Sequence, residues 1–129
     1  MIRLVLVDDQ PSVRQGLRMR LTLEPDMTVV GEASNGREAM TLVQQLAPDI
    51  VLMDVEMPEM DGIEASAVMR ASTPQSAVVM LSIYDDVSMR ARAHAAGAAA
   101  FVNKSGAIDV LLAMIRQAAE HRKTETGSL

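Results

Sequence analysis

The chain has 129 residues, a formal net charge of -5 and no cysteine. This length fits one domain with a single core, and the lack of cysteine excludes disulfide scaffolds, thiolate metal sites and cysteine nucleophiles. The acidic balance argues against direct nucleic-acid binding by this chain, because such binding needs a basic face that neutralises phosphates. The sequence contains neither an apolar run long enough to span a membrane nor a signal peptide, so we expect a cytoplasmic protein without a membrane partner.

The first half of the chain predicts two rounds of strand and helix. Residues 2–7 and 27–33 are short aliphatic runs typical of buried strands. Apolar residues at helical spacing predict a helix over 12–24, which a proline ends. A second helix is predicted over 35–47, with Asn35 as its N-cap and a glutamate three residues further on, close to a capping box.

The second half repeats this alternation three times. The predicted strands are residues 49–53, 77–81 and 98–102. The predicted helices are residues 61–72, a segment from Asp85 or Asp86 to Gly97, and residues 107–122. Asp61 and Glu64 form a second capping pair at the start of the first of these. Strands separated by helices of this length require right-handed crossovers, and hence a parallel sheet covered on both faces.

The expected fold class is therefore α/β, with a single doubly wound sheet of five parallel strands and helices on both faces. The strand order does not follow from this pattern, although the flavodoxin-like order is a usual solution for five strands. We expect one domain over residues 1–122. Residues 123–129 are predicted to form a polar, unstructured tail or the start of a linker.

Polar side chains stand where four of the predicted strands end. Asp8 and Asp9 follow the first strand, Asp54 the third, Ser82 the fourth and Lys104 the fifth. Taken singly, each has an ordinary interpretation as a cap, a turn former or a solvated surface group. Because the carboxyl ends of parallel strands share one edge, where ligands collect, their joint placement predicts a site organised around Asp54.

Three neighbouring carboxylates repel one another unless a cation lies between them. Mg²⁺ is a hard cation that binds a few carboxylates and completes its coordination with water and phosphate oxygens. We predict that Asp9, Asp54 and the backbone carbonyl of Glu56 ligate it, and that Asp8 holds it directly or through water. Three carboxylates, one divalent cation and Lys104 then balance to zero net charge, which suits an incoming phosphoryl group.

Phosphoryl transfer needs a nucleophile, a metal and donors to the equatorial oxygens. Asp54 is the predicted nucleophile and would form an aspartyl phosphate. Ser82 and Lys104 are predicted to donate to the phosphoryl oxygens.

With these residues in place, the chain resembles the receiver domains of two-component response regulators over residues 1–122. The resemblance is carried by Asp8-Asp9, Asp54, the run Met57-Pro58-Glu59-Met60-Asp61-Gly62, Ser82 and Lys104. The run that begins at Glu56 and the pair Lys104-Ser105 look most like the NarL/FixJ (LuxR-type) subfamily. Receivers of that subfamily usually precede a helix-turn-helix DNA-binding domain.

The resemblance implies a signalling switch rather than an enzyme with external turnover. It implies that a sensor histidine kinase phosphorylates Asp54 with Mg²⁺, that Ser82 then shifts, and that this shift is coupled to the aromatic ring of Phe101. Glu56 and Tyr84 occupy positions that tune the lifetime of the phosphoryl group in that family. Further expected partners are a second copy of the chain on activation, and DNA through an output domain that this chain does not contain.

One position departs from the pattern of the family. Many receivers have a proline with a cis peptide bond after the site lysine, whereas Ser105 follows Lys104 here. A cis bond before a residue other than proline costs about 3–4 kcal/mol. The sequence leaves the isomer open.

The segment 87–96 is predicted to be the mobile part. It has high helix propensity but few large apolar side chains, so we expect it to pack weakly and to form an output face with Ser82 and Phe101. His94 and His121 are interpreted as surface residues rather than phosphorelay histidines.

Other functions remain open at this point. An aspartate-nucleophile phosphatase of the haloacid dehalogenase type would need an Asp-x-Asp pair after the first strand, which Asp8-Asp9-Gln10 does not supply. A nucleotide or flavin module would need a Gly- or Ser/Thr-rich phosphate loop there. A free-standing receiver and a phosphorylation-independent interaction module are the remaining alternatives.

Overall fold

The structure is a computed structural model that describes residues 1–57, 61–84 and 86–127. Within these residues, five strands alternate with five helices. The strands are β1 (Ile2–Val7), β2 (Met27–Ala33), β3 (Ile50–Asp54), β4 (Ala77–Ser82) and β5 (Ala100–Asn103). The helices are α1 (Pro11–Thr22), α2 (Gly36–Leu46), α3 (Gly62–Ser72), α4 (Val87–Ala95) and α5 (Ile108–Gly127).

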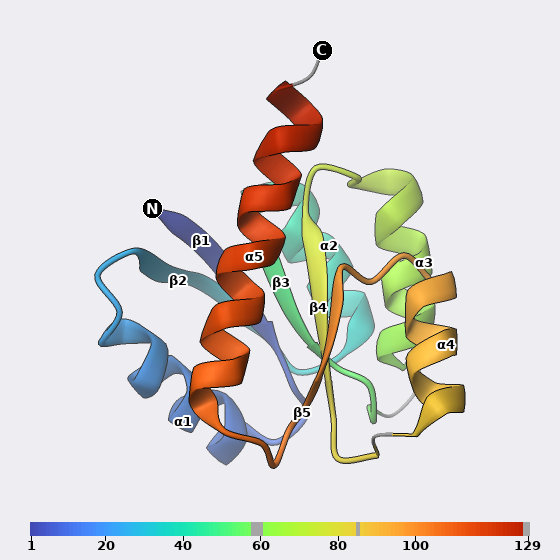
Figure 1. Cartoon of the computed structure of the whole chain (residues 1–129), viewed down its shortest axis with the longest axis horizontal. Coiled ribbons are helices and arrows are strands. Elements are labelled where there is room, and N and C mark those ends of the chain that lie inside the picture. The colour runs from blue at the N-terminus through green and yellow to red at the C-terminus, as the bar shows by residue number, and fades with distance from the viewer. Residues whose placement is uncertain (58–60, 85, 128–129) are drawn as a thin grey trace.

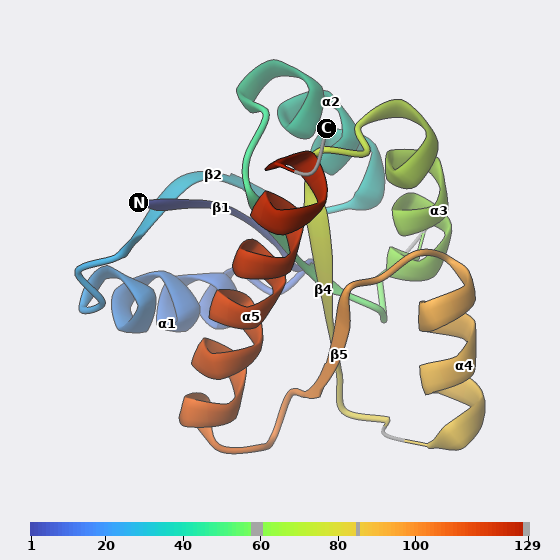
Figure 2. The same ribbon diagram turned by 45° about the horizontal axis from the view of Figure 1, so that its top comes forward.

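All strands pair in parallel in one sheet of order β2-β1-β3-β4-β5. Helices α1 and α5 cover one face of this sheet, and α2, α3 and α4 cover the other (Figure 1; Figure 2). The predicted doubly wound, flavodoxin-like fold is confirmed, and the structure supplies the strand order that the sequence pattern left open.

Successive side chains of each strand point to opposite faces of the sheet, which divides the core into two layers. In β1, Leu4 and Leu6 pack with Ile115 of α5, whereas Val5 and Val7 pack on the opposite face with Val43 of α2. These side chains are almost completely buried. Truncating one buried aliphatic side chain to alanine costs about 2–5 kcal/mol of folding free energy. The packing of both layers against β1 therefore fixes the position of this strand and of its carboxyl end.

The helix starts follow the predicted capping residues. The side chains of Asn35, Asp61 and Asp86 each accept a hydrogen bond from the backbone N–H three residues later, at 2.9, 2.9 and 2.7 Å. Of the two candidates for the start of α4, Asp86 is the cap, while Asp85 lies outside the described residues. Such a cap stabilises a helix by about 1 kcal/mol.

Several element ends differ from the prediction. Helix α1 begins at Pro11 rather than at residue 12, because proline is pre-organised for the first helical position. Strand β5 begins at Ala100 rather than at residue 98, since Gly97 turns the chain at φ 92° and the N–H of Ala98 donates back to the carbonyl of Ala93.

The last helix also differs from its prediction. Helix α5 extends to Gly127, so the expectation of an unstructured tail is wrong for residues 123–127. No proline interrupts this stretch, and its lysine and glutamate are compatible with a helix. Within the described part of the chain, no helix is both long and apolar enough to cross a membrane.

Candidate functional site

The carboxyl ends of the strands lie at the lower edge of the sheet in Figure 1, and the polar residues predicted for the site stand at or directly after these ends. Asp8 directly follows β1, Asp54 is the last residue of β3, Ser82 is the last residue of β4, and Lys104 directly follows β5. Asp8, Asp54 and Ser82 are only 1, 3 and 0 % exposed. Buried polar groups at a strand end are costly unless they have partners, so their contacts decide what the site can do.

Lys104 joins the two buried carboxylates. Its Nζ lies 2.7 Å from Oδ2 of Asp8 and 3.3 Å from Oδ2 of Asp54. The backbone N–H of Lys104 donates to the carbonyl of Ser82 at 2.9 Å, which fixes the start of the loop after β5. Burial alone would lower the pKa of the Lys104 ammonium, but the contacts with Asp8 and Asp54 outweigh it and raise that pKa. The lysine is therefore a firmly protonated counter-charge.

Asp54 is the perturbed acid of the site. Burial, reinforced by the neighbouring charge of Asp8, raises the pKa of Asp54 to about 6, against the opposing effect of Lys104. Its Oδ1 also accepts a hydrogen bond from the N–H of Glu56 at 3.2 Å. A buried carboxylate that one lysine only partly compensates is suited to react with, or bind, a group that brings further positive charge.

A third carboxylate completes an oxygen-rich cluster. Asp8, Asp9 and Asp54 can each offer one carboxylate oxygen, and these oxygens lie within 4.8 Å of one another. Asp9 is exposed, whereas the other two are buried. Because Mg²⁺ prefers a few carboxylate oxygens and retains water ligands, this donor set fits that cation.

The glycine that opens α3 explains how the loop after Asp54 stays close to the site. A Cβ at Gly62 would collide with the carbonyl oxygen of Asp54, so a side chain there would push α3 away from the end of β3. The N–H of Gly62 donates to the carbonyl of Val55 at 3.1 Å. Residues 58–60 of the predicted motif lie outside the described residues.

Ser82 makes a contact that the sequence did not predict. Its Oγ donates to Oε1 of Glu56 at 2.8 Å and accepts from the N–H of Tyr84 at 2.9 Å. The sequence analysis placed Glu56 at the site through its backbone carbonyl and at a position that tunes the phosphoryl lifetime, but it did not predict the bond between the Glu56 side chain and Ser82. The sequence carried no local signal for this contact, because it depends on the register of the sheet, in which Asp54 pairs with Leu81. This pairing brings the residues that follow both strands close together.

Phe101 lies half-buried on β5, next to α4. The guanidinium carbon of Arg90 lies 5.0 Å from the centroid of the Phe101 ring, and Nη1 of Arg90 donates to the Phe101 carbonyl at 3.5 Å. Ala93 is the buried residue of α4, in keeping with the weak packing predicted for this helix. The Tyr84 side chain is exposed, as is that of His94.

Two other sequence expectations concern single positions. His121 is exposed, as interpreted from its place on the surface of the last helix. The described residues contain no cis peptide bond, so the Lys104–Ser105 bond is trans.

Comparisons with known proteins identify the family. The response regulator receiver domain matches residues 4–116. The uncharacterized transcriptional regulatory protein YxjL of Bacillus subtilis is 39 % identical over 118 residues, which cover 92 % of this chain and 54 % of YxjL. Protein-glutamate methylesterase/protein-glutamine glutaminase 3 of Anaeromyxobacter dehalogenans is 43 % identical over 105 residues, covering 81 % of this chain and 31 % of that protein.

A solved structure agrees with these sequence relatives. A LuxR-family two-component response regulator from Aurantimonas sp. superposes with a TM-score of 0.89 at 33 % identity, covering 93 % of this chain and 86 % of that one. The chain spans about half the length of the curated transcriptional regulators that it matches. It belongs to the response regulator receiver domain family of two-component systems, with relatives of the LuxR type.

Proposed function

We propose that this chain is a phosphorylation-activated switch that accepts a phosphoryl group on Asp54. The observation that carries the proposal is the buried pair Asp8 and Asp54, held by Lys104 with Asp9 beside it. A solvated surface aspartate would have neither the burial nor the shared lysine. The donor is a sensor histidine kinase, as expected for a receiver domain of a two-component system.

The transfer reaction uses Asp54 as the nucleophile. A carboxylate oxygen of Asp54 forms a bond to phosphorus while the bond between phosphorus and the imidazole nitrogen of the donor breaks. Asp8, Asp9, Asp54 and the backbone carbonyl of Glu56 would hold Mg²⁺, which when bound would supply positive charge that offsets repulsion between Asp54 and the incoming oxygens. Lys104 contributes a second positive charge, and Ser82 a neutral hydrogen-bond donor.

The output lies beyond this chain. Relatives of similar identity include transcriptional regulators and a methylesterase, so the receiver is shared among proteins with different outputs. We propose a transcriptional output, reached through a DNA-binding domain outside residues 1–129, with the receiver itself covering 1–122. The activated form would pair with a second copy of the chain, in the cytoplasm. The chain would catalyse only its own phosphorylation and dephosphorylation.

Intact mass after incubation with acetyl phosphate tests the proposal. We expect one phosphoryl adduct on the wild type in the presence of Mg²⁺, and none after chelation of the metal or in Asp54→Asn. Circular dichroism of each sample checks that the fold is intact. A folded wild type that binds Mg²⁺ but gains no adduct would contradict the proposal and favour a phosphorylation-independent interaction module.

A further inference from the structure

The Ser82 hydroxyl is fully committed in this structure. It donates to Oε1 of Glu56 at 2.8 Å and accepts from the N–H of Tyr84 at 2.9 Å. Ser82 is completely buried, so water does not compete for these bonds. Both partners follow the ends of the strands that carry the site, which places the hydroxyl between two loops.

A serine hydroxyl has a single hydrogen to donate. While that hydrogen is bonded to Glu56, Ser82 cannot also donate it to a phosphoryl oxygen on Asp54. The acceptor is a carboxylate, and hydrogen bonds to ionised acceptors are roughly twice as strong as neutral ones. The Glu56 side chain and the phosphoryl group therefore compete for the same hydrogen.

The position of Glu56 makes this competition responsive to the state of Asp54. The N–H of Glu56 donates to Oδ1 of Asp54, so a change at that carboxylate acts directly on the Glu56 backbone. The second carboxylate oxygen of Glu56, Oε2, is buried and has no hydrogen-bond partner among the described residues. A phosphoryl group brings close to two negative charges to this region. Repulsion would then act on a glutamate that Ser82 holds by one oxygen only.

We propose that the Glu56 carboxylate is a latch that holds the Ser82 hydroxyl in the unphosphorylated state, and that phosphorylation transfers the hydroxyl's hydrogen bond from Glu56 to the phosphoryl group. The proposal rests on the proposed function of Asp54. No covalent bond changes at Ser82 or Glu56; one hydrogen-bond acceptor replaces another. Glu56 is thus a positioning residue, since it acts through Ser82.

Beryllofluoride binding in the presence of Mg²⁺ provides the test, because beryllofluoride imitates a phosphoryl group on an aspartate. Glu56→Gln keeps the length of the side chain and an acceptor oxygen but removes the charge. We expect it to tighten the apparent dissociation constant about tenfold, because the competing hydrogen bond loses its charge assistance. The constant is measured from amide resonances near the site by ¹⁵N–¹H NMR.

A double-mutant cycle separates the latch from simple charge repulsion. In the Ser82→Ala background, Glu56→Gln should change the constant by less than about twofold, because no hydroxyl remains to be released. An equal tightening in both backgrounds would mean that Glu56 only repels the ligand, and would overturn the latch. No tightening in either background would overturn it as well.

The amide of Tyr84 reports on the latch without any ligand. Its N–H donates to Ser82 Oγ, so weakening the bond between Ser82 and Glu56 should shift its resonance in Glu56→Gln. An unchanged Tyr84 resonance would contradict the latch. A wild type that fails to bind beryllofluoride with Mg²⁺ would instead overturn the proposed function, and with it the exchange, while the Tyr84 resonance would still show whether Glu56 holds Ser82.

Discussion

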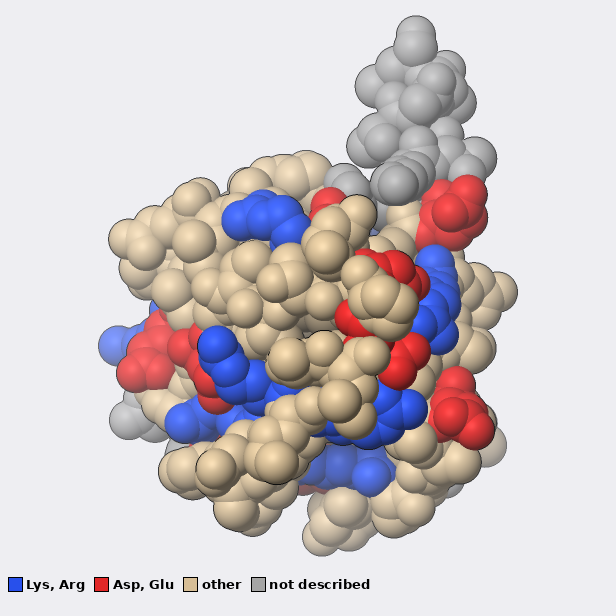
Figure 3. Space-filling view, turned by 90° about the vertical axis from the view of Figure 1, so that its left-hand side faces the viewer, with Lys and Arg blue, Asp and Glu red and all other residues tan. Residues whose placement is uncertain are grey.

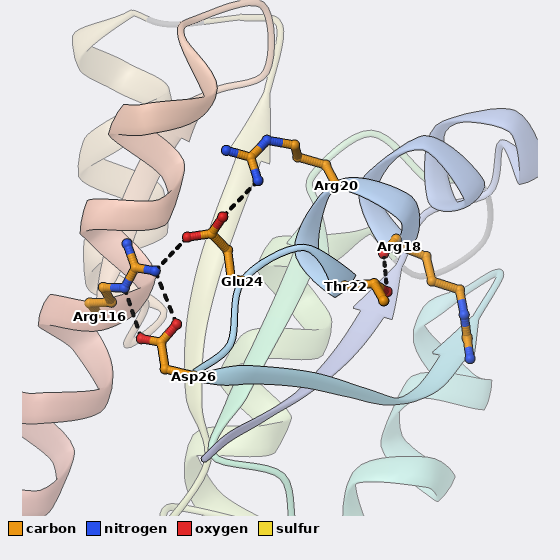
Figure 4. Close-up of polar contacts among 6 residues, drawn as sticks. All are labelled: Arg18, Arg20, Thr22, Glu24, Asp26 and Arg116. Carbon is orange, nitrogen blue, oxygen red and sulfur yellow. Dashed lines mark hydrogen bonds and ion pairs between the residues drawn. The ribbon is translucent and has the colours of Figure 1, made fainter.

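Two clusters of charge, one at each end of the sheet, contain the same kinds of group. At the carboxyl ends of the strands, Lys104 lies between Asp8 and Asp54. At the amino ends, Arg116 of α5 lies between Glu24 and Asp26, at 2.7 and 2.9 Å (Figure 4). Each cluster has two carboxylates that share a cation, yet only the first has the properties of a reactive site.

Burial accounts for the difference. The hydrogen bonds from Arg20 and Arg116 lower the pKa of Glu24, and the bond from Arg116 lowers the pKa of Asp26. Burial instead raises the pKa of Asp54 to about 6. Partly exposed carboxylates such as Glu24 and Asp26 gain from a nearby cation at little desolvation cost, whereas a buried one loses more hydration than a single lysine restores.

On the face shown in Figure 3, acidic and basic side chains lie beside one another. One such contact joins Arg18 of α1 to Glu32 of β2 at 2.5 Å. Exposed pairs of this kind add little to stability, so removing a charge should have very different effects at the two ends of the sheet.

Removing Lys104 should have the largest effect on stability. Lys104→Met leaves Asp8 and Asp54 buried without their counter-charge, and we expect a loss of about 3 kcal/mol in the free energy of unfolding at pH 7.5 without divalent cations. Urea denaturation measures this change.

Lys104→Arg is the matched control, since it keeps the positive charge and should lose less free energy of unfolding than Lys104→Met. Saturating Mg²⁺ should restore part of the stability of Lys104→Met, because the cation replaces the missing charge. If Lys104→Met lost no more free energy of unfolding than Arg116→Gln, the claim that burial distinguishes the two charge clusters would be contradicted.

Asp54→Asn should raise the stability of the fold, whereas Lys104→Met lowers it. A folded-state pKa above the unfolded value means that the charged form is disfavoured in the folded protein. The contribution of Asp54 to stability is therefore present below the ordinary aspartate pKa of 3.8 and is lost as the pH rises through about 6. Asparagine carries no charge, so we expect the variant to be more stable than the wild type at pH 7.5 by about 2–3 kcal/mol in the absence of metal.

Thermal or urea unfolding over a pH series checks both the sign and the window. The gain in stability of Asp54→Asn over the wild type should shrink as the pH falls from about 7 to about 4, because this range includes both the folded-state and the unfolded-state pKa of Asp54. Asp9→Asn, at an exposed carboxylate of the same cluster, serves as the control and should gain less. A variant less stable than the wild type at pH 7.5 would show that Asp54 is not strained by its burial.

Arg116→Gln should have the smallest effect. The lowered pKa values of Glu24 and Asp26 mean that their contribution is present above the unfolded pKa values and is lost as the pH falls through the folded ones. We expect a decrease of no more than a few degrees in the unfolding midpoint at neutral pH. The difference from the wild type should vanish in acid and shrink at high salt. A large loss that persists in about 1 M NaCl would contradict a screened surface cluster.

The position of the site at the strand ends could be predicted from the sequence, because each pattern involved only residues close together in the chain. A run such as 49–53 is a buried strand by its own composition, and a parallel sheet brings the residues after each strand to one edge. Asp8, Asp54 and Lys104 could therefore be placed together from the sequence alone. The caps at Asn35 and Asp61 were equally local, since an Asx side chain and the N–H three residues later lie on one turn.

What the sequence could not show depends on side-chain direction and on distant contacts. The bond between Ser82 and Glu56 joins the end of β4 to the loop after β3 across 26 residues of sequence, and nothing local to Glu56 indicates that its carboxylate turns toward β4. Arg116 and Asp26 are 90 residues apart. The end of α5 was missed because a polar segment without apolar spacing gives no sign of a helix, even when its residues permit one.

Locating the phosphoryl group on a single residue tests most directly whether Asp54 is the phosphoacceptor. The wild type is treated with acetyl phosphate and Mg²⁺, reduced with borohydride, which converts an aspartyl phosphate to homoserine, and mapped by peptide mass spectrometry. We expect homoserine at position 54, with Asp8 and Asp9 unchanged. Homoserine at position 8 or 9 instead, or an adduct that maps to a residue away from the carboxyl edge of the sheet, would contradict the mechanism.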